Sequence, residues 1–385
     1  MTRDRLAFAI ALTLVMDASV WARSRVIYRG RVGAGNPACL VAAGPTGAAY
    51  LLLASPPEFR SIDSQYRHHL TVNDPPLGDD DIFLSGDIRY AVARSGAGTA
   101  LLAGRSLLHQ FTAFYQDRWI VSEGAGLGSW KVSDTLDTAG AVHAMASRNG
   151  VVWAVGYDTH EELGSQWLVR RRSAGRTWTT VDRQPGYATA VQVAADGVVY
   201  VAGIAGQPHQ WIVRRSTDGQ SWATVDRFRP DPNHASFPRA IAADGDGHVH
   251  VVGYAQVDFV PPEDESSDAT HWIVRSSTDG GFHFHTTDDF TPKKRGWAIA
   301  DDVAILPSGD VVVVGAAGVP LRRTIRILGH GQTRWKSLPK PAMTVPFEHH
   351  FAIARGPRGT ITFAGEVWTK KDRLECLVEQ IDLGH

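Results

Sequence analysis

From about residue 25 onward, apolar positions alternate with polar or small ones over short stretches, as in His248-Val249-His250-Val251 and Thr360-Ile361-Thr362-Phe363. A period of two with β-branched residues, bounded by Gly or Asp-Gly, predicts β-strands. No stretch beyond the first 22 residues has the 3.6-residue apolar period of an amphipathic helix. The pattern therefore predicts an all-β protein.

A pair of glycines six residues apart recurs along the chain, with the alternating strand between them. The pairs are Gly98/Gly104, Gly150/Gly156, Gly197/Gly203, Gly247/Gly253, Gly309/Gly315 and Gly359/Gly365. A seventh copy, residues 42–47, keeps the first glycine, Gly47, and has Leu53 at the second position six residues later. From Leu53 on, the second positions lie 47 to 62 residues apart, which indicates a repeat architecture.

Each repeat is predicted to hold four strands; in the fourth unit these are residues 190–195, 198–203, 210–215 and 221–228. Four-stranded units of about fifty residues are typical of β-propeller blades. Aromatic residues keep the same register in the third and fourth strands and are expected to fill the space between blades. They lie eleven residues apart at Trp119/Trp130, Trp167/Trp178 and Trp211/Trp222, with Thr324/Trp335 as a fourth step.

The last unit, with strands at 351–355, 360–365 and 373–381, lacks a fourth strand. Residues 25–32 form a strand that belongs to no unit and would complete it, which removes an unpaired edge. We therefore expect one domain, residues 23–385, that is a seven-bladed propeller closed by its N-terminal strand. Six or eight blades remain open, because the first unit is the most degenerate.

The turn between the third and fourth strands carries a second motif. Ser277-x-Asp279-x-Gly281-x-x-Phe284 resembles the Asp-box of bacterial neuraminidase (BNR) repeats, and a copy one residue shorter is formed by Ser216, Asp218, Gly219 and Trp222. The resemblance implies the sialidase-like propeller superfamily and a structural role for these residues. Physically, the Asp can accept turn amide hydrogens and Gly can adopt positive φ.

Catalytic residues do not emerge. The Arg-Ile-Pro signature that the resemblance would imply is absent, and neither its arginine triad nor its Tyr/Glu pair can be placed, so sialidase chemistry is not expected. Another glycoside hydrolase would need two facing carboxylates. Glu161, Glu162 and the acidic stretch 257–268 lie in loops between second and third strands, where a solvated loop is the simpler interpretation.

The function we expect is non-enzymatic binding of a glycan or a protein on the face that holds these loops; the alternative is a glycoside hydrolase that uses loop carboxylates. Candidate residues are those predicted to converge on that face: Tyr90, Tyr157, His160, Glu161, Tyr254, Trp297, His350 and Trp368. Two carboxylates roughly 5–10 Å apart in a central pocket would favour the hydrolase.

Composition and the N-terminal segment limit the binding partners and the cellular location that we expect. With 39 basic and 40 acidic residues, no charge excess points to nucleic acid. The basic start, the apolar run 6–16 and the small residues up to Ala22 predict a signal peptide, residues 1–22. We therefore expect a secreted protein, extracellular or periplasmic, that is monomeric and has no membrane span once the signal peptide is removed.

 Cys39 and Cys376, near the two ends of the propeller, could form a disulfide across the seam or remain free thiols. His248/His250 and His283/His285 lack a third ligand in the sequence, so no metal and no cofactor is expected.

Overall fold

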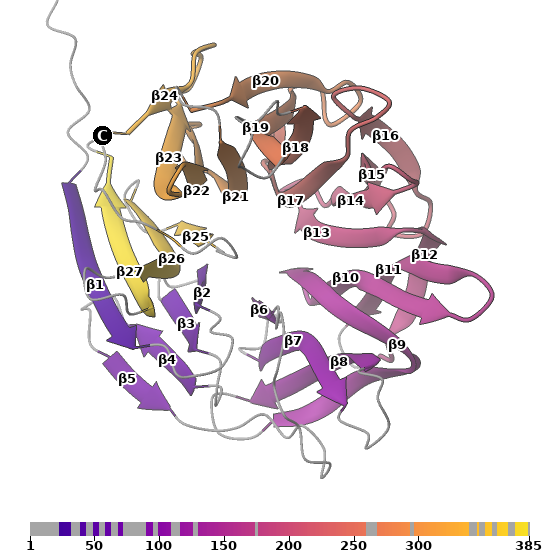
Figure 1. Ribbon diagram of the computed structural model, residues 1–385. Helices are drawn as coiled ribbons and strands as arrows, with labels where there is room; N and C mark the ends of the chain where they lie inside the picture. Colours follow the sequence, from indigo (N-terminus) through magenta and orange to yellow (C-terminus); the bar gives the residue numbers. More distant parts are fainter. Residues whose placement is uncertain are drawn as a thin grey trace, which may run out of the picture.

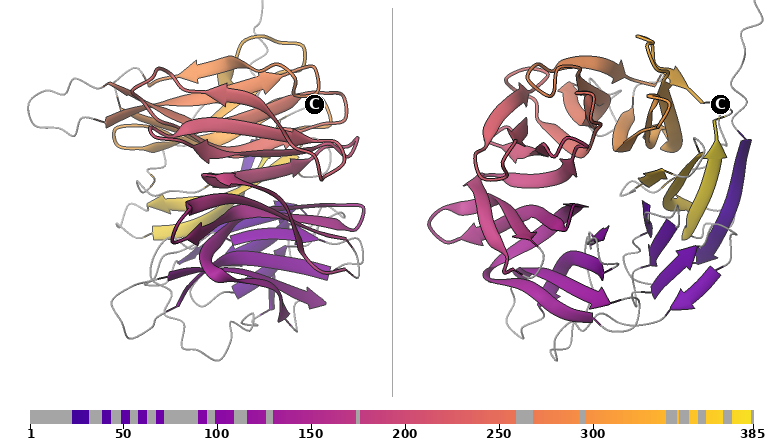
Figure 2. Two further views of the ribbon diagram at one scale, coloured as in Figure 1. Left: turned by 90° about the vertical axis from the view of Figure 1, so that its right-hand side faces the viewer. Right: turned by 180° about the vertical axis from the view of Figure 1, so that it is seen from behind.

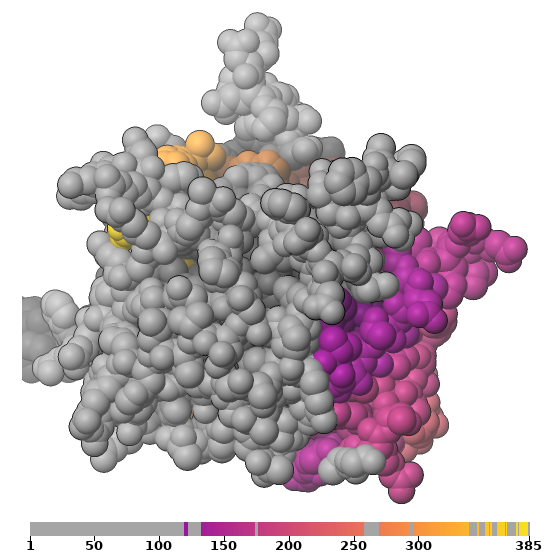
Figure 3. Space-filling view, turned by 90° about the horizontal axis from the view of Figure 1, so that it is seen from below, coloured from indigo at the N-terminus to yellow at the C-terminus, as the bar shows by residue number. Residues whose placement is uncertain are grey.

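A computed structural model of the chain describes residues 23–31, 39–43, 49–53, 58–62, 68–71, 90–94, 99–108, 116–125, 130–173, 176–258, 268–292, 296–338, 345, 351–355, 360–368 and 374–383. Side chains are described from Trp119 onward, with gaps, and these residues are coloured in Figure 3. Every regular element in these ranges is a strand. The described residues contain no helix long and apolar enough to cross a membrane.

The strands form five antiparallel sheets of four strands and one of seven, placed around a common centre (Figures 1 and 2). One four-stranded sheet comprises β2 (Cys39–Ala43), β3 (Ala49–Leu53), β4 (Glu58–Ile62) and β5 (His68–Thr71). The seven-stranded sheet comprises β6 (Tyr90–Arg94), β7 (Thr99–Leu108), β8 (Gln116–Ala125), β9 (Trp130–Arg148), β10 (Val151–His160), β11 (Gly164–Ser173) and β12 (Thr179–Pro185).

The next three sheets follow one another along the chain. The first comprises β13 (Tyr187–Val193), β14 (Val199–Ala205), β15 (Gln210–Ser216) and β16 (Ala223–Phe228). The second comprises β17 (Ser236–Ala243), β18 (Val249–Asp258), β19 (Asp268–Ser277) and β20 (His285–Phe290). The third comprises β21 (Trp297–Ile305), β22 (Val311–Gly318), β23 (Arg322–Leu328) and β24 (Lys336–Ser337).

The last sheet joins the two ends of the described chain. It comprises β25 (Phe351–Arg355), β26 (Thr360–Trp368), β27 (Leu374–Asp382) and β1 (Arg23–Arg31), in the order β1-β27-β26-β25. β1 pairs with β27 in antiparallel register from Arg23↔Asp382 to Arg31↔Glu375. Figure 1 shows β1 (indigo) along the outer side of β27 (yellow).

The long strand β9 explains why one sheet has seven strands. Its first half, from Trp130 to Ala139, pairs with β8, and its second half, from Ala139 to Arg148, pairs with β10. It is therefore the fourth strand of the β6-β7-β8 group and the first strand of the β10-β11-β12 group. A sequence pattern that marks strands but not the turns between units cannot show that two units share one continuous strand.

In four of the repeat pairs, the second glycine is required by the first strand of its sheet. A Cβ placed at Gly156, Gly203, Gly253 or Gly315 would lie only 1.8–2.1 Å from a backbone carbonyl oxygen of that strand. Each of these glycines lies beside a β-bulge, where the inner strand has one extra residue and its carbonyl turns toward the second strand. The recurring glycine is thus a steric requirement of the bulged pairing.

The recurring tryptophans fill the space between sheets, as the sequence predicts. The side chains of Trp119, Trp167, Trp211 and Trp272 are fully buried. The ring of Trp167 reaches the next sheet at Gly203, and that of Trp272 reaches Gly315, where a Cβ would lie 2.4 and 2.7 Å from a ring carbon. The glycines therefore accommodate both a carbonyl group and an aromatic ring.

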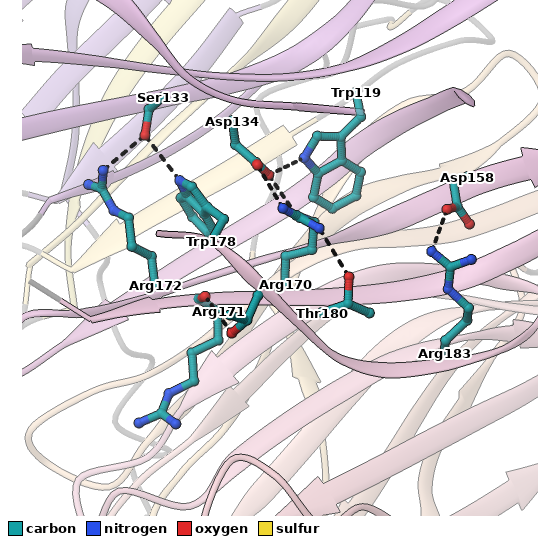
Figure 4. A network of polar contacts seen from close by, with 11 residues as sticks. Trp119, Ser133, Asp134, Asp158, Arg170, Arg171, Arg172, Trp178, Thr180 and Arg183 are labelled. Atoms are coloured by element: carbon teal, nitrogen blue, oxygen red, sulfur yellow. Dashed lines mark hydrogen bonds and ion pairs between the residues drawn. The ribbon is translucent and has the colours of Figure 1, made fainter. Parts of the chain in front are cut away.

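A series of ion pairs that the sequence pattern does not predict also joins neighbouring four-stranded units. An Arg of the third strand donates two hydrogen bonds of 2.5–3.0 Å to an Asp on the fourth strand of the preceding unit. Figure 4 shows the first of these pairs, in which the Trp119 indole donates to the same carboxylate. The pairs are Arg170–Asp134, Arg214–Asp182, Arg275–Asp226 and Arg326–Asp288.

Candidate functional site

The pairing register defines two edges of each sheet. The start of the first strand lies beside the end of the second: Tyr187 pairs with Ile204, and Phe237 with Tyr254. We call this the upper edge; it holds the connections between successive units and the loops between second and third strands. The turns between first and second and between third and fourth strands lie at the opposite, lower edge.

One aromatic cluster lies at the upper edge between β10 and β13. The rings of Tyr157 and Tyr187 meet edge-on with centroids 4.9 Å apart, and His143 lies 5.4 Å from Tyr157. The Tyr187 hydroxyl donates to the hydroxyl of Ser165 at 2.9 Å. All four side chains are partly exposed. The cluster combines ring surface with hydroxyl and imidazole groups.

A second aromatic cluster lies at the upper edge of the β17–β20 sheet. The rings of Phe237 and Tyr254 are stacked at 5.0 Å, and His209 from the preceding sheet lies 5.6 Å from Phe237. The Arg239 guanidinium lies over Tyr254 at 5.5 Å and pairs with Asp301 of the following sheet at 3.3 Å. Three successive sheets therefore contribute to one continuous group of side chains.

His160 and Asp158 belong to a polar group at the end of β10. The buried Asp158 carboxylate accepts a hydrogen bond of 2.7 Å from Arg183, and His160 Nε2 lies 3.1 Å from the same oxygen. Arg183 also lies 2.8 Å from His160 (Figure 4 shows its contact with Asp158). Glu161, in the following loop, is exposed. The Asp158 carboxylate is thus paired with the Arg183 guanidinium.

The remaining predicted site residues lie at other positions along the sheets. Trp297, at the start of β21, is partly buried against the apolar core that β22, β25 and β26 share. Tyr90 begins β6 and Trp368 ends β26, but their side chains lie outside the described residues, as does all of His350. The side chains of Cys39 and Cys376 lie outside the description too.

The two turn motifs lie at the lower edge, away from the aromatic clusters. Asp279 Oδ1 accepts hydrogen bonds of 3.0 Å from the amides of Phe282 and His283, and one of 2.7 Å from the Ser277 hydroxyl. The Ser277 hydroxyl accepts the amide of Gly281, whose φ is +80°. These bonds, led by that from the His283 amide, hold the pKa of Asp279 well below its usual value.

The shorter motif repeats this arrangement. Asp218 Oδ1 accepts the amides of Gln220 and Ser221 at 2.7 Å, and the Ser216 hydroxyl accepts the amide of Gly219 at 2.8 Å. The aromatic residue that ends each motif packs inward: Trp222 meets Trp153 edge-on at 6.1 Å, and Phe284 packs against the core formed by β14, β15 and β18. Both carboxylates are therefore engaged in shaping their turns.

A set of polar residues on the first strands escaped the sequence analysis. The residue at the β-bulge of β9, β13, β17 and β21 is His143, Thr189, Arg239 and Asp301, respectively. These positions precede the second glycine of their repeat by 13 or 14 residues. A polar residue at this spacing within an otherwise apolar inner strand was the available signal.

Three of the four bulge residues contact the first strand of the next unit. His143 donates to the carbonyl of Ala188 at 2.8 Å, Thr189 donates to that of Pro238 at 2.9 Å, and Arg239 pairs with Asp301. Beside Asp301, the Asp302 carboxylate accepts the amide of Ile353 at 2.7 Å. The innermost strands are thus linked by polar contacts from β9 to β25.

Asp302 is the most perturbed acid of this group. Burial of its carboxyl outweighs the hydrogen bonds from the amides of Ile353 and Val303, and raises its pKa to about 7. The neighbouring Asp301 carboxylate adds to the upward shift. A carboxyl group with such a pKa is partly protonated near neutral pH.

The histidines noted in the sequence have local partners. His248 pairs with Asp244 at 2.7 Å, and His283 with Asp279 at 2.6 Å. His250 is buried beside the Ser276 hydroxyl, and burial lowers its pKa to about 4. Among the described residues, no group of three or more His, Cys, Asp or Glu side chains has the placement to hold a metal ion.

No family model and no curated protein matches this chain. Its structure is similar to that of polysaccharide lyase Uly1, with a TM-score of 0.59, 11% identity, and 93% of this chain and 92% of that chain covered. A streptogramin B lyase matches with a TM-score of 0.57 and 12% identity over 92% of this chain and 97% of that one. Virginiamycin B lyase from Staphylococcus aureus matches with a TM-score of 0.53 and 13% identity over 92% and 99%.

At such low identities, these similarities show the fold and carry no activity with them. They agree with the antiparallel four-stranded sheets placed around a common centre. The chain is therefore an all-β protein with a β-propeller fold.

Proposed function

We propose that this protein binds a glycan, without cleaving it, at the upper edge of its propeller. The observation that carries the proposal is the pair of aromatic clusters, Tyr157/Tyr187 and Phe237/Tyr254, on neighbouring blades. Both are partly exposed and both have polar side chains beside the rings. Ring surface next to a few oriented polar groups is the usual composition of a small-molecule site.

The carboxylates near the clusters are paired with arginine side chains, which supports binding over catalysis. Asp158 is held by Arg183, and Asp301 pairs with Arg239. A sugar ring suits these clusters better than a flat protein surface does, because its apolar faces pack on aromatic rings while its hydroxyls need donors and acceptors. A protein ligand is the other outcome of the binding test.

A glycoside hydrolase is the second candidate, and one observation favours it. Asp302, whose burial raises its pKa to about 7, stands beside Asp301, and a carboxyl group with a raised pKa is what the general acid of glycosidic bond cleavage needs. Arabinanase from Penicillium chrysogenum, a structure of similar fold that was solved with arabinobiose, makes arabino-oligosaccharides a sensible first substrate.

The binding test uses the full chain on an oligosaccharide array, followed by calorimetry on the best ligand. Tyr187→Ala and Tyr254→Ala should each raise Kd about five- to tenfold, since an aromatic contact contributes about 1 kcal/mol. Phe282→Ala removes an exposed ring at the lower edge and is the matched control. Equal affinity of all three variants, or binding that only Phe282→Ala abolishes, would reject the upper edge as the site.

The same ligand separates binding from hydrolysis. Incubation with the protein should leave the oligosaccharide intact, as judged by chromatography of the products. Release of shorter sugars by the wild type but not by Asp302→Asn would replace the binding function with the hydrolase.

For the architecture, we propose seven blades, with β9 shared by the second and third and with β1 as the outer strand of the last. The pairing of β1 with β27 and the buried ion pair between Arg323 and Glu379 of the last two blades support this arrangement. Deletion of residues 23–31 would expose the edge of β27 and should cause aggregation or unfolding. A truncated protein that stays monomeric and melts like the longer one would reject this closure.

We also propose that the protein is exported after removal of about the first 22 residues, as the basic and apolar start suggests. N-terminal sequencing of exported protein should then begin between about residues 18 and 25. Recovery of intact Met1 from a cytoplasmic fraction would contradict export.

A further inference from the structure

The bulge register is a position on the inner strands at which four successive units carry polar side chains of different chemistry. On β9 and β13 the residues that flank the bulge are small or apolar, namely Val142 and Ala144, and Ala188 and Ala190; on β21 the bulge is followed by Asp302. The bulge residues are instead an imidazole, a hydroxyl, a guanidinium and a carboxylate on four successive blades. Since bulges re-aim a side chain and occur often near functional sites, this register is a candidate for ligand recognition.

Arg239 is the bulge residue most directly connected to the aromatic clusters. Its guanidinium lies over Tyr254, whose other neighbour is the stacked ring of Phe237. The Arg239 side chain is 20% exposed, whereas that of Asp301 is 2% exposed. Arg239 can therefore reach a ligand at the upper edge, while Asp301 acts behind it.

Asp301 fixes both the direction and the net charge of this arrangement. Its carboxylate lies 3.3 Å from Arg239 Nη1, so the positive charge is compensated inside the protein. Stacking on Tyr254 holds the plane of the guanidinium. The N–H groups of Arg239 are thus presented in a set orientation without an excess of positive charge. This arrangement suits the hydroxyl groups of a ligand rather than a ligand carboxylate or sulfate.

We propose that Arg239, oriented and neutralised by Asp301, reads the hydroxyl groups of a neutral sugar that packs against Phe237 and Tyr254. This inference rests on the proposed glycan-binding function and deepens it by naming the sugar class. Arg239 is the contact residue, and Asp301 is a positioning residue. An acidic sugar is disfavoured because the Asp301 carboxylate already compensates the charge of the guanidinium.

The experiment compares the full chain and its variants on neutral gluco-, xylo- and arabino-oligosaccharides and on acidic galacturonate and sulfated galactose oligosaccharides. Wild type should prefer the neutral set. Arg239→Gln should weaken that binding at least tenfold, and Arg239→Lys should restore little of it, because an ammonium lacks the planar set of donors. Arg227→Gln, an exposed position on the outer strand β16, is the matched control for charge and should bind like wild type.

Asp301→Asn supplies a readout that loss of stability would not produce. It leaves the guanidinium charge uncompensated, so the ratio of acidic to neutral binding should rise at least tenfold. A melting curve of each variant confirms that the folded protein is being measured.

The outcomes separate this inference from the proposed function. Binding of neutral sugars that depends on Tyr254 but is unchanged in Arg239→Gln overturns the inference alone, as does a wild-type preference for acidic sugars. A wild-type protein that binds no sugar of either set overturns both.

Discussion

Replacing Gly253 by Ala tests whether the recurring glycine is a steric requirement of the bulged blade. The added Cβ would lie 2.0 Å from the carbonyl oxygen of Phe237 and 2.9 Å from Cα of Pro238. The first distance is about 1 Å shorter than real Cβ contacts allow, and the obstacle is backbone rather than a flexible side chain. β17 must therefore move away from β18, with loss of ladder hydrogen bonds.

Overpacking of this kind costs about 3 kcal/mol. The entropy of unfolding is about 2.1 cal/mol/K per residue, or roughly 0.8 kcal/mol/K for this chain, so the cost corresponds to a Tm lowered by about 4 °C. Differential scanning calorimetry measures this shift directly. Because Phe237 moves with β17, binding of the glycan identified on the array should weaken as well.

Gly164→Ala is the matched control. Gly164 has a φ of +65°, and a Cβ there would meet no atom within 4 Å, so only backbone strain of about 1 kcal/mol opposes the change. Gly253→Ala should therefore melt well below Gly164→Ala. If the two variants melt together, or if Gly253→Ala melts like wild type, the steric explanation of the repeat is wrong.

Three further predictions concern charged groups. Arg275→Leu leaves the Asp226 carboxylate buried without its cation and should lower the free energy of unfolding, measured in urea, by about 3–5 kcal/mol. The double variant Arg275→Leu with Asp226→Leu should recover part of that free energy. An equal loss in both variants would show that the unpaired carboxylate is not the cause. Asp279→Ala should lower Tm without changing ligand affinity. Because the pKa of Asp279 is depressed, the loss of Tm relative to wild type should be full above about pH 4 and should shrink in more acidic solution. A variant that melts like wild type but no longer binds the ligand would make Asp279 a functional residue. The pKa of Asp302 is raised to about 7, so the stabilisation that this group contributes is full below about pH 4 and is lost as pH rises to 7. The Tm of wild type should therefore fall relative to that of Asp302→Asn across this range. A Tm difference between the two proteins that stays constant from pH 4 to pH 8 would contradict the shift.

Strand positions were predictable because their signal is local. In the fourth unit, the third strand starts at Gln210 as expected, and the fourth ends at Phe228. The first strand starts at Tyr187, three residues before the expected start, because the bulge at Thr189 interrupts the alternation there. An extra residue shifts the period of two, so a reading based on alternation loses the beginning of the strand.

The candidate site was predictable only in part. Tyr157 and Tyr254 were identified as aromatic residues near the ends of second strands, and each does lie in an aromatic cluster. Their partners Tyr187 and Phe237 lie at the starts of first strands and were missed. Phe237 meets Tyr254 through strand pairing and Tyr187 meets Tyr157 through packing between sheets, and neither relation is encoded in one segment alone.

The sequence by itself determined the repeat, the strands, the glycine pairs and the buried tryptophans, since each depends on neighbours close along the chain. Only the tertiary structure decided which polar groups meet. Arg239 and Asp301 lie 62 residues apart in the sequence. Their 3.3 Å contact exists because two bulges at the same register face each other across neighbouring blades. Contacts between blades depend on how whole sheets pack, and that packing is the sum of many burial terms rather than a pattern in any one segment.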